Sequence, residues 1–204
     1  RARQAYDQGD YQRAYQAWPH CYTQQRRALK ALMAGADKRR ACRAVDLHTK
    51  KLLVSAFQSS LFNKVLVARM PDIDKLLLGD MAYKHDNGAC FRVEDPVAEQ
   101  PRCHTWQISP TGPILGPRMT ELTGPAGQIE GPIIQHAKAL IAQNQHVSNI
   151  LAKGERRPLR FRPQNVSVCG GDDDLGPYVE VSFELPSGSY ATVLIREITK
   201  SPVA

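Results

Sequence analysis

The fold assignment of this 204-residue chain rests on one segment near its end, Leu185-Pro-Ser-Gly-Ser-Tyr-Ala-Thr-Val-Leu-Ile-Arg-Glu-Ile198. Directly before it, Tyr178-Val-Glu-Val-Ser-Phe-Glu-Leu185 nearly alternates between apolar and polar residues, which predicts a half-buried strand. Gly170-Gly-Asp-Asp-Asp174 comes before that strand and is expected to be a flexible acidic turn. A calcium loop does not fit, because the glycines precede the acidic residues and no glutamate follows at the twelfth position.

A basic run lies further towards the N-terminus. Two apolar residues, Leu159 and Phe161, are surrounded by four arginines: Arg156, Arg157, Arg160 and Arg162. This pattern suits a strand with one charged edge and one buried face. A solvated strand edge is the alternative to a functional role, and the four arginines are also the best local candidates for phosphate binding.

The rest of the chain mixes helices with short strands, which indicates an α+β fold. Residues 2–44 are predicted to be a small helical hairpin, 45–69 a long amphipathic helix that ends near Met70-Pro71, and 126–153 a helix stopped by Gly154. Short strands are expected after Gly79-Asp80, with Asn87-Gly88 as a hairpin turn. Residues 109–119 are dense in glycine and proline and are expected to form a loop.

Composition limits the class of protein. The chain has no run of about 18 apolar residues and no apolar core near its first residues, so we expect a soluble, cytoplasmic protein without membrane contact. Five scattered cysteines show no Cys-x-x-Cys pair, so neither a disulfide framework nor a metal site is expected. The formal net charge of +7 suits a polyanionic partner, although a solvated basic face explains it as well.

Three motifs in the same order resemble the TruD family of tRNA pseudouridine synthases. They are the closing segment Leu185–Ile198, the helix motif Val54-Ser-Ala-Phe-Gln-Ser-Ser-Leu-Phe-Asn63, and the loop motif Gly112-Pro-Ile-Leu-Gly-Pro-Arg-Met119. The resemblance implies a family-specific α/β insertion over residues 1–162. Residues 163–204 would then be C-terminal strands that re-enter the mixed sheet of a pseudouridine synthase catalytic domain.

From these motifs, the resemblance implies an isomerase that converts a uridine of tRNA, the one at position 13, into pseudouridine. It implies a monomeric enzyme that needs no cofactor and no metal. The target base leaves its stack, and Tyr190 is the candidate aromatic wall for it, supported by Gly188, Ser189, Arg196 and Glu197. The candidate RNA-binding residues are Arg39, Arg40, Lys50, Lys51, Arg156, Arg157, Arg160 and Arg162, with solvated helix and strand faces as the alternative.

The nucleophile of the family is not found in this chain. The family carries its aspartate in a Gly-Thr-Lys-Asp stretch followed by an Asn-Tyr-Phe-Gly motif, and neither occurs here. Asp37, in Gly35-Ala-Asp-Lys-Arg-Arg-Ala41, is instead expected to be a helix-turn residue. Two hypotheses follow: a fragment of the enzyme that needs its upstream half as partner, or a non-catalytic RNA-binding or structural module derived from the family.

Overall fold

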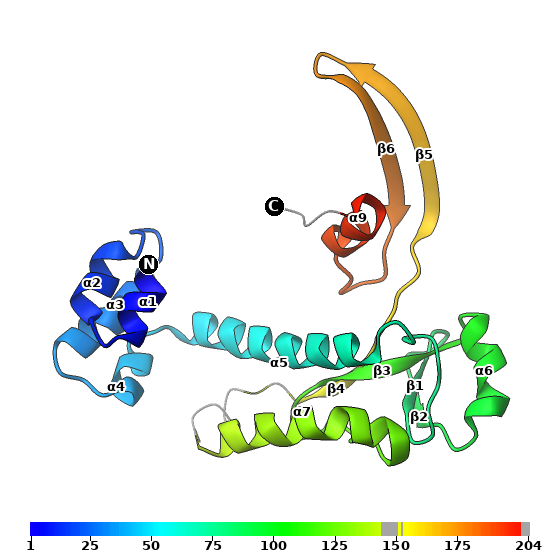
Figure 1. The fold of residues 1–204 in the computed structure, drawn as a ribbon, viewed down its shortest axis with the longest axis horizontal. Coiled ribbons are helices and arrows are strands. Elements are labelled where there is room, and N and C mark those ends of the chain that lie inside the picture. The colour runs from blue at the N-terminus through cyan, green and yellow to red at the C-terminus, as the bar shows by residue number, and fades with distance from the viewer. Residues whose placement is uncertain (144–150, 152, 201–204) are drawn as a thin grey trace. The chain divides into compact units, whose positions relative to one another are not determined.

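The computed structural model describes residues 1–143, 151 and 153–200. Helices and antiparallel strands are mixed, so the expected α+β class is confirmed (Figure 1). The chain forms two compact units, each assembled from separate stretches: 1–68, 113–121 and 128–155 in the first, and 69–112, 122–127 and 156–204 in the second. The expected boundary between residues 162 and 163 concerns an insertion into a longer chain and stays a prediction.

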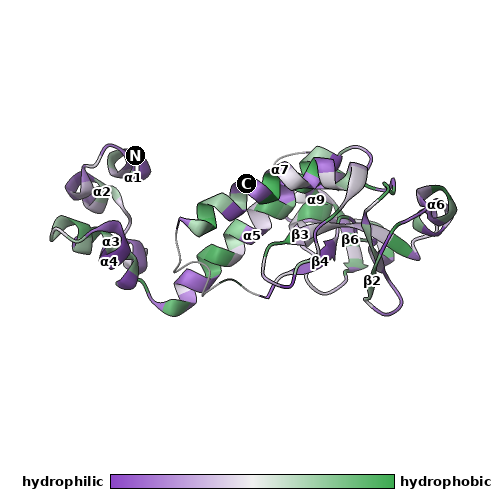
Figure 2. Ribbon diagram, turned by 90° about the horizontal axis from the view of Figure 1, so that it is seen from below, coloured by the Kyte–Doolittle hydropathy of each residue, from purple (hydrophilic) through white to green (hydrophobic). Residues whose placement is uncertain are grey.

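The first unit begins with a bundle of four short helices, where a hairpin of two was expected. They are α1 (Ala2–Asp7), α2 (Tyr11–Ala17), α3 (Thr23–Met33) and α4 (Lys38–Arg43). Their ribbons are largely coloured as hydrophilic residues in Figure 2, and their core is made of small and aliphatic residues, Ala5, Ala14, Leu29, Leu32 and Ala41. Asp37 caps α4 by accepting a hydrogen bond from the Arg40 amide at 2.7 Å, which is the helix-turn role expected for it.

Two longer helices complete the first unit. The helix α5 (Leu47–Arg69) ends before the Met70-Pro71 bond, as predicted. It contributes Leu61 to a core with Leu115, Ile134 and Ala137. The buried Gln58 side chain donates to the Leu115 carbonyl at 2.6 Å, which satisfies both groups away from water.

The predicted helix over residues 126–153 was wrong in its extent, because α7 (Gly124–Ala142) ends earlier. Residues 144–150 and 152 of the predicted range lie outside the described residues. Gly154 does not stop this helix. It has a φ of +81°, and a Cβ there would lie 2.6 Å from Gly116 Cα, so the backbone of Gly116 requires a glycine at this place.

The second unit holds most of a four-stranded sheet in the order β2-β1-β3-β4. The strands are β1 (Met81–Lys84), β2 (Cys90–Arg92), β3 (Ile108–Ile114) and β4 (Glu155–Pro158). The central β1 pairs antiparallel with both β2 and β3, and residues 85–88 form the expected turn between β1 and β2. Helix α6 (Pro96–His104) was not predicted. It packs Cys103 against Leu76, Ala82, Val93 and Ile108 in the core.

The prediction of a loop over residues 109–119 was wrong, because β3 runs through its first half. Every residue from Ile108 to Pro113 is buried. Pro110 pairs with Ala82 and accepts a hydrogen bond from the Leu159 amide at 2.9 Å, which requires only its carbonyl. A proline is compatible with extended backbone where no amide donor is needed, and burial here outweighs the local turn preference.

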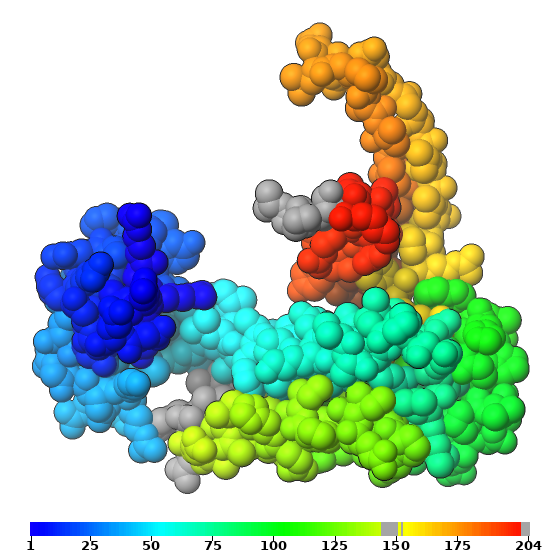
Figure 3. All heavy atoms as spheres, in the orientation of Figure 1, coloured from blue at the N-terminus to red at the C-terminus, as the bar shows by residue number. Residues whose placement is uncertain are grey.

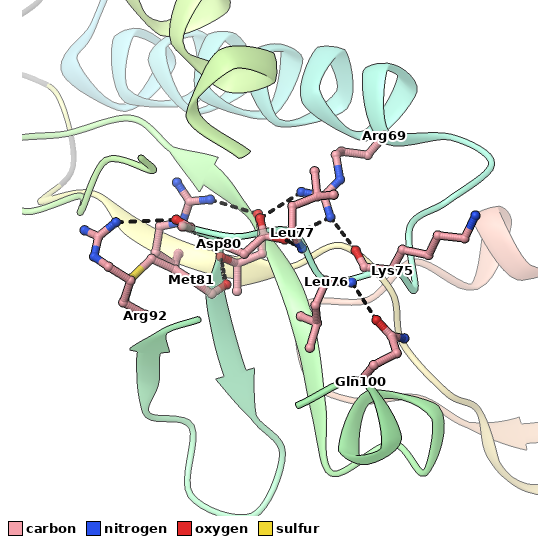
Figure 4. A network of polar contacts seen from close by, with 11 residues as sticks. Arg69, Lys75, Leu76, Leu77, Asp80, Met81, Arg92 and Gln100 are labelled. Carbon is pink, nitrogen blue, oxygen red and sulfur yellow. Dashed lines mark hydrogen bonds and ion pairs between the residues drawn. The ribbon is translucent and has the colours of Figure 1, made fainter. Parts of the chain in front are cut away.

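A buried ion pair joins the end of α5 to the start of β1. The guanidinium of Arg69 donates to both carboxylate oxygens of Asp80, at 2.8 and 3.1 Å, and also to the Lys75 carbonyl at 2.7 Å (Figure 4). The Leu77 amide donates to the same carboxylate at 2.8 Å. Each charge is therefore matched by a partner inside the unit, as a buried charge requires.

The C-terminal residues form a separate two-stranded antiparallel sheet of β5 (Gln164–Asp173) and β6 (Gly176–Glu184), followed by α9 (Ala191–Thr199). The strand expected at Tyr178–Leu185 is confirmed, but it is more exposed than half-buried: Tyr178 and Val179 are both exposed, and Figure 3 shows the hairpin as a thin layer of atoms. The closing segment is a helix, not a further strand. Gly170–Asp173 belong to β5, so the acidic turn is shorter than expected and centres on Asp174 and Leu175.

Among the described residues, no helix has the length and apolar content needed to cross a membrane.

Candidate functional site

A tight turn at the end of β6 presents Tyr190. Gly188 has a φ of +85°, a conformation that glycine adopts without strain, and the Ser189 amide donates to the Pro186 carbonyl at 3.1 Å. Tyr190 follows as the N-cap residue of α9, in extended conformation and with 67% of its side chain exposed. The turn therefore holds an aromatic ring outside the local core, where another molecule or segment can contact its face.

The two remaining motif residues lie on α9. Arg196 and Glu197 are exposed, and the Glu197 carboxylate pairs with the Lys200 ammonium at 3.0 Å. The apolar residues of this helix are only partly covered, with Ile195 and Ile198 exposed and none of its residues buried. The segment therefore offers an aromatic face and an apolar helix surface.

Two of the four arginines in the basic run serve the fold. Arg156 is buried and donates from Nε to Thr111 Oγ1 at 3.0 Å and from Nη2 to the Thr111 carbonyl at 2.8 Å. Arg160 donates from Nε to Ser109 Oγ at 3.0 Å, and its guanidinium lies over the Trp106 ring, 4.1 Å from the centroid. Both arginines thereby fix β3.

The other two arginines are more accessible: Arg157 is half-buried and Arg162 is exposed. The predicted RNA-binding residues in the first unit are Arg39 and Arg40 on α4, both exposed, with Lys50 half-buried and Lys51 exposed near the start of α5. The structure thus brings Arg39, Arg40, Lys50 and Lys51 into one unit and the arginines of residues 156–162 into the other.

A polar and aromatic cluster around His85 was not foreseen. His85 Nε2 and Ser109 Oγ are 2.8 Å apart, and the ring lies edge-on to Tyr83 with 5.3 Å between centroids. Burial lowers the pKa of His85, and the positive charge of Arg160 lowers it further. The residues come from different parts of the chain, so no local spacing in the sequence indicates the cluster.

Cys103 and His104 lie at the end of α6. The Cys103 thiol donates to the Asp74 carbonyl at 3.1 Å, and burial raises its pKa, which keeps it in the unreactive thiol form. In the part of the chain that the structure describes, no three His, Cys, Asp or Glu side chains gather as a metal site would need.

Comparison with known proteins places this fold and this closing segment in one family. The family model of tRNA pseudouridine synthase D (TruD) matches residues 1–198. Curated proteins named tRNA pseudouridine synthase D from Geobacter sulfurreducens and Geotalea daltonii are 40% and 38% identical to the chain over 202 residues, which is 98% of it. A solved structure from Methanosarcina mazei, assigned to the same kind of protein, has the same fold, with a TM-score of 0.75 at 22% identity over 98% of this chain.

The chain belongs to the TruD family of tRNA pseudouridine synthases, as its three motifs indicated. It covers 48% of the Geobacter sulfurreducens protein, 50% of the Geotalea daltonii protein and 50% of the Methanosarcina mazei chain. The chain therefore spans about half the length of the relatives it matches.

Proposed function

We propose that this chain is the C-terminal part of an isomerase that converts a uridine of tRNA, at position 13 by family resemblance, into pseudouridine. The support is the family match over residues 1–198 together with the exposed ring of Tyr190 in the closing segment. The nucleophilic aspartate comes from the upstream half of the same enzyme. Residues 1–162 are the insertion and 163–204 belong to the catalytic domain of a monomeric, cytoplasmic enzyme that uses no cofactor and no metal.

Tyr190 forms one wall of the pocket that receives the flipped uracil. Its ring stands at the end of a turn that is fixed by the left-handed Gly188 and by the hydrogen bond between Ser189 and Pro186. Stacking of a base on an aromatic side chain contributes about 1–3 kcal/mol and is made by the face of the ring. The phenol hydroxyl is not needed for this contact.

The test compares Tyr190→Ala with Tyr190→Phe in the complete enzyme, with tRNA pseudouridine formation as the assay. The alanine variant is expected to lose activity by roughly 5- to 150-fold, corresponding to about 1–3 kcal/mol, and the phenylalanine variant to keep it. Because phosphate contacts dominate affinity, tRNA binding should change little in either variant. Tyr22→Ala is the matched control, since Tyr22 is also an exposed tyrosine but lies outside the closing segment. Normal turnover in Tyr190→Ala would refute the assignment.

The basic residues of both units hold the phosphates of the tRNA. In the run at residues 156–162, the accessible Arg157 and Arg162 carry this role, while Arg156 and Arg160 support it by fixing β3. In the first unit, tRNA phosphates are held by the basic side chains of α4 and of the start of α5, namely Arg39, Arg40, Lys50 and Lys51. The motif residues Ser189, Arg196 and Glu197 shape and orient the segment around Tyr190.

The exposed apolar surface of the C-terminal residues supports the proposal of an upstream partner half. Val166, Val168, Ile195 and Ile198 are exposed on a thin hairpin and on a helix that has no buried residue, and exposed apolar side chains in such numbers mark a contact surface. Sequencing the DNA upstream of this sequence distinguishes a part of the enzyme from a non-catalytic module. Gly-Thr-Lys-Asp and Asn-Tyr-Phe-Gly motifs in the same frame support the enzyme, and a start codon near Arg1 supports the non-catalytic module.

A further inference from the structure

A hollow in the N-terminal helical bundle is lined almost entirely by basic and hydroxyl side chains. It has a volume of about 240 Å³, and its lining residues come from α2, from α3 and from the loop between them: Tyr15, His20, Thr23, Arg26, Arg27 and Lys30. None of these six residues is acidic. Arg26, Arg27 and Lys30 follow one another on α3 within little more than one turn, so their charges gather at the same place.

The positive charges of this hollow have no acidic partner in the part of the chain that the structure describes. Within the described residues, no carboxylate forms an ion pair with Arg26, Arg27 or Lys30. Arg27 and Lys30 are exposed, so their ammonium and guanidinium groups are accessible to a ligand. A concave surface with charges of one sign and no counter-charge attracts an anion.

Arg26 is already fixed by contacts within the bundle. Its Nη1 donates to the carbonyls of Tyr15 and Trp18, at 2.7 and 2.8 Å, and its guanidinium lies over the Tyr15 ring, 3.8 Å from the centroid. The Lys30 ammonium lies 5.7 Å from the same centroid. Arg26 therefore supplies a fixed positive charge in the lining of the hollow, while the exposed Arg27 and Lys30 are the groups that can reach a ligand.

The surroundings of the Tyr15 side chain are electropositive because Arg26 and Lys30 lie beside its ring. Burial would raise the pKa of its phenol, but hydrogen bonding and positive charge from Arg26 and Lys30 outweigh burial and lower the pKa. The surroundings thus favour negative charge on an oxygen atom, and an oxygen of a bound anion would experience the same attraction.

We propose that this hollow binds a phosphodiester group of the tRNA backbone, with Arg27 and Lys30 as its principal ligands. Thr23 and Tyr15, which carry hydroxyl donors, also line the hollow. The proposal rests on the proposed function, because tRNA is the polyanion on which such an enzyme acts. It adds a further phosphate contact in the first unit, formed by residues other than the exposed basic side chains of α4 and α5.

The test measures tRNA affinity of the complete enzyme as a function of salt concentration. Arg27→Gln/Lys30→Gln is expected to weaken binding by roughly ten-fold or more and to reduce the slope of log affinity against log salt by about 1–2, because each lost phosphate contact releases about one counterion less. At saturating tRNA the kcat should be unchanged, with the loss confined to KM. Arg27→Lys/Lys30→Arg keeps the charges and should keep the slope.

Arg13→Gln/Lys64→Gln is the matched control, since it removes two exposed charges of the same unit that lie outside the hollow. A slope equal to that of this control would overturn the proposal, even when pseudouridine formation is normal and the proposed function stands. Perturbation of the Lys30 NMR signal by inorganic phosphate with an unchanged tRNA slope would also overturn it, since the hollow would then take free phosphate only. Absence of tRNA binding in the parent enzyme would instead refute the proposed function.

Discussion

Replacing Arg69 by methionine is expected to destabilise the second unit by about 3–5 kcal/mol. The side chains of Arg69 and Asp80 are only 3% and 0% exposed. Methionine keeps much of the aliphatic length but removes two hydrogen bonds from a charged donor to the carboxylate, each worth about 1.5–3 kcal/mol. Among the described residues, the Leu77 amide at 2.8 Å is then the hydrogen-bond donor that Asp80 retains. Leaving one buried charge unpaired in this way costs about 3–5 kcal/mol.

Urea unfolding followed by tryptophan fluorescence measures this loss. Trp106 lies in the second unit and Trp18 in the first, so a Trp18→Phe background makes Trp106 the reporter of the unit that contains the ion pair. Asp72→Asn is the control, because it breaks an ion pair with Lys75 whose side chains are 57% and 64% exposed. Such a surface pair contributes about 0–1 kcal/mol.

The double variant Arg69→Met/Asp80→Asn tests the cause of the loss. Because it removes both charges, it should lose less than the sum of the two single variants, with a coupling of about 0.5–3 kcal/mol. A loss in Arg69→Met below about 1 kcal/mol, as small as that of the surface control, would show that water screens the pair. The inference of a buried, structural ion pair would then be wrong.

Two further predictions concern His85 and the β5–β6 hairpin. Burial lowers the pKa of His85 from 6.5 and the charge of Arg160 lowers it further, so the fold favours the neutral ring, and this stabilisation is present above pH 6.5 and lost as pH falls through the lowered pKa. The urea midpoint should therefore fall less between about pH 7 and pH 5 in His85→Gln than in the parent protein. An NMR pKa of His85 above 6.5 would contradict this prediction. A Cβ at Gly171 would lie 2.3 Å from Cζ of the exposed Tyr178 side chain, whereas the nearest atom to a Cβ at Gly170 is the Tyr178 carbonyl oxygen at 4.0 Å. Gly171→Ala should therefore displace the Tyr178 ring and change its NMR shifts, while Gly170→Ala leaves them unchanged. Equal ring shifts in both variants would contradict the contact.

Local patterns in the sequence predicted the elements whose burial repeats at regular intervals. The long helix α5 was recognised because its buried positions Leu61 and Val65 recur with helical spacing. The strand β3 was missed because Pro110 and Pro113 favour turns locally, while their burial depends on β1, which is distant in the sequence. Tertiary contacts of this kind are not encoded in any short window.

In the candidate site, too, the sequence did not predict contacts between residues that are distant in the chain. The closing motif identified Tyr190 from the sequence, and the structure adds that its ring is exposed at a helix N-terminus. Arg156 and Arg160 were grouped with Arg157 and Arg162 because neighbouring arginines look alike in a sequence. Their hydrogen bonds go to Thr111 and Ser109, across 45 and 51 residues of chain, and no spacing rule predicts such partners.

The contacts of Arg26 have a consequence for the entropy of binding. A long flexible side chain normally loses about 0.5–1.5 kcal/mol of rotamer freedom when a ligand immobilises it. The guanidinium of Arg26 is already held by the Tyr15 and Trp18 carbonyls and by the Tyr15 ring, so folding of the helical bundle has ordered it in advance. Its attraction for an anion is therefore available at no further ordering cost, whereas Arg27 and Lys30 must still be ordered when the ligand arrives.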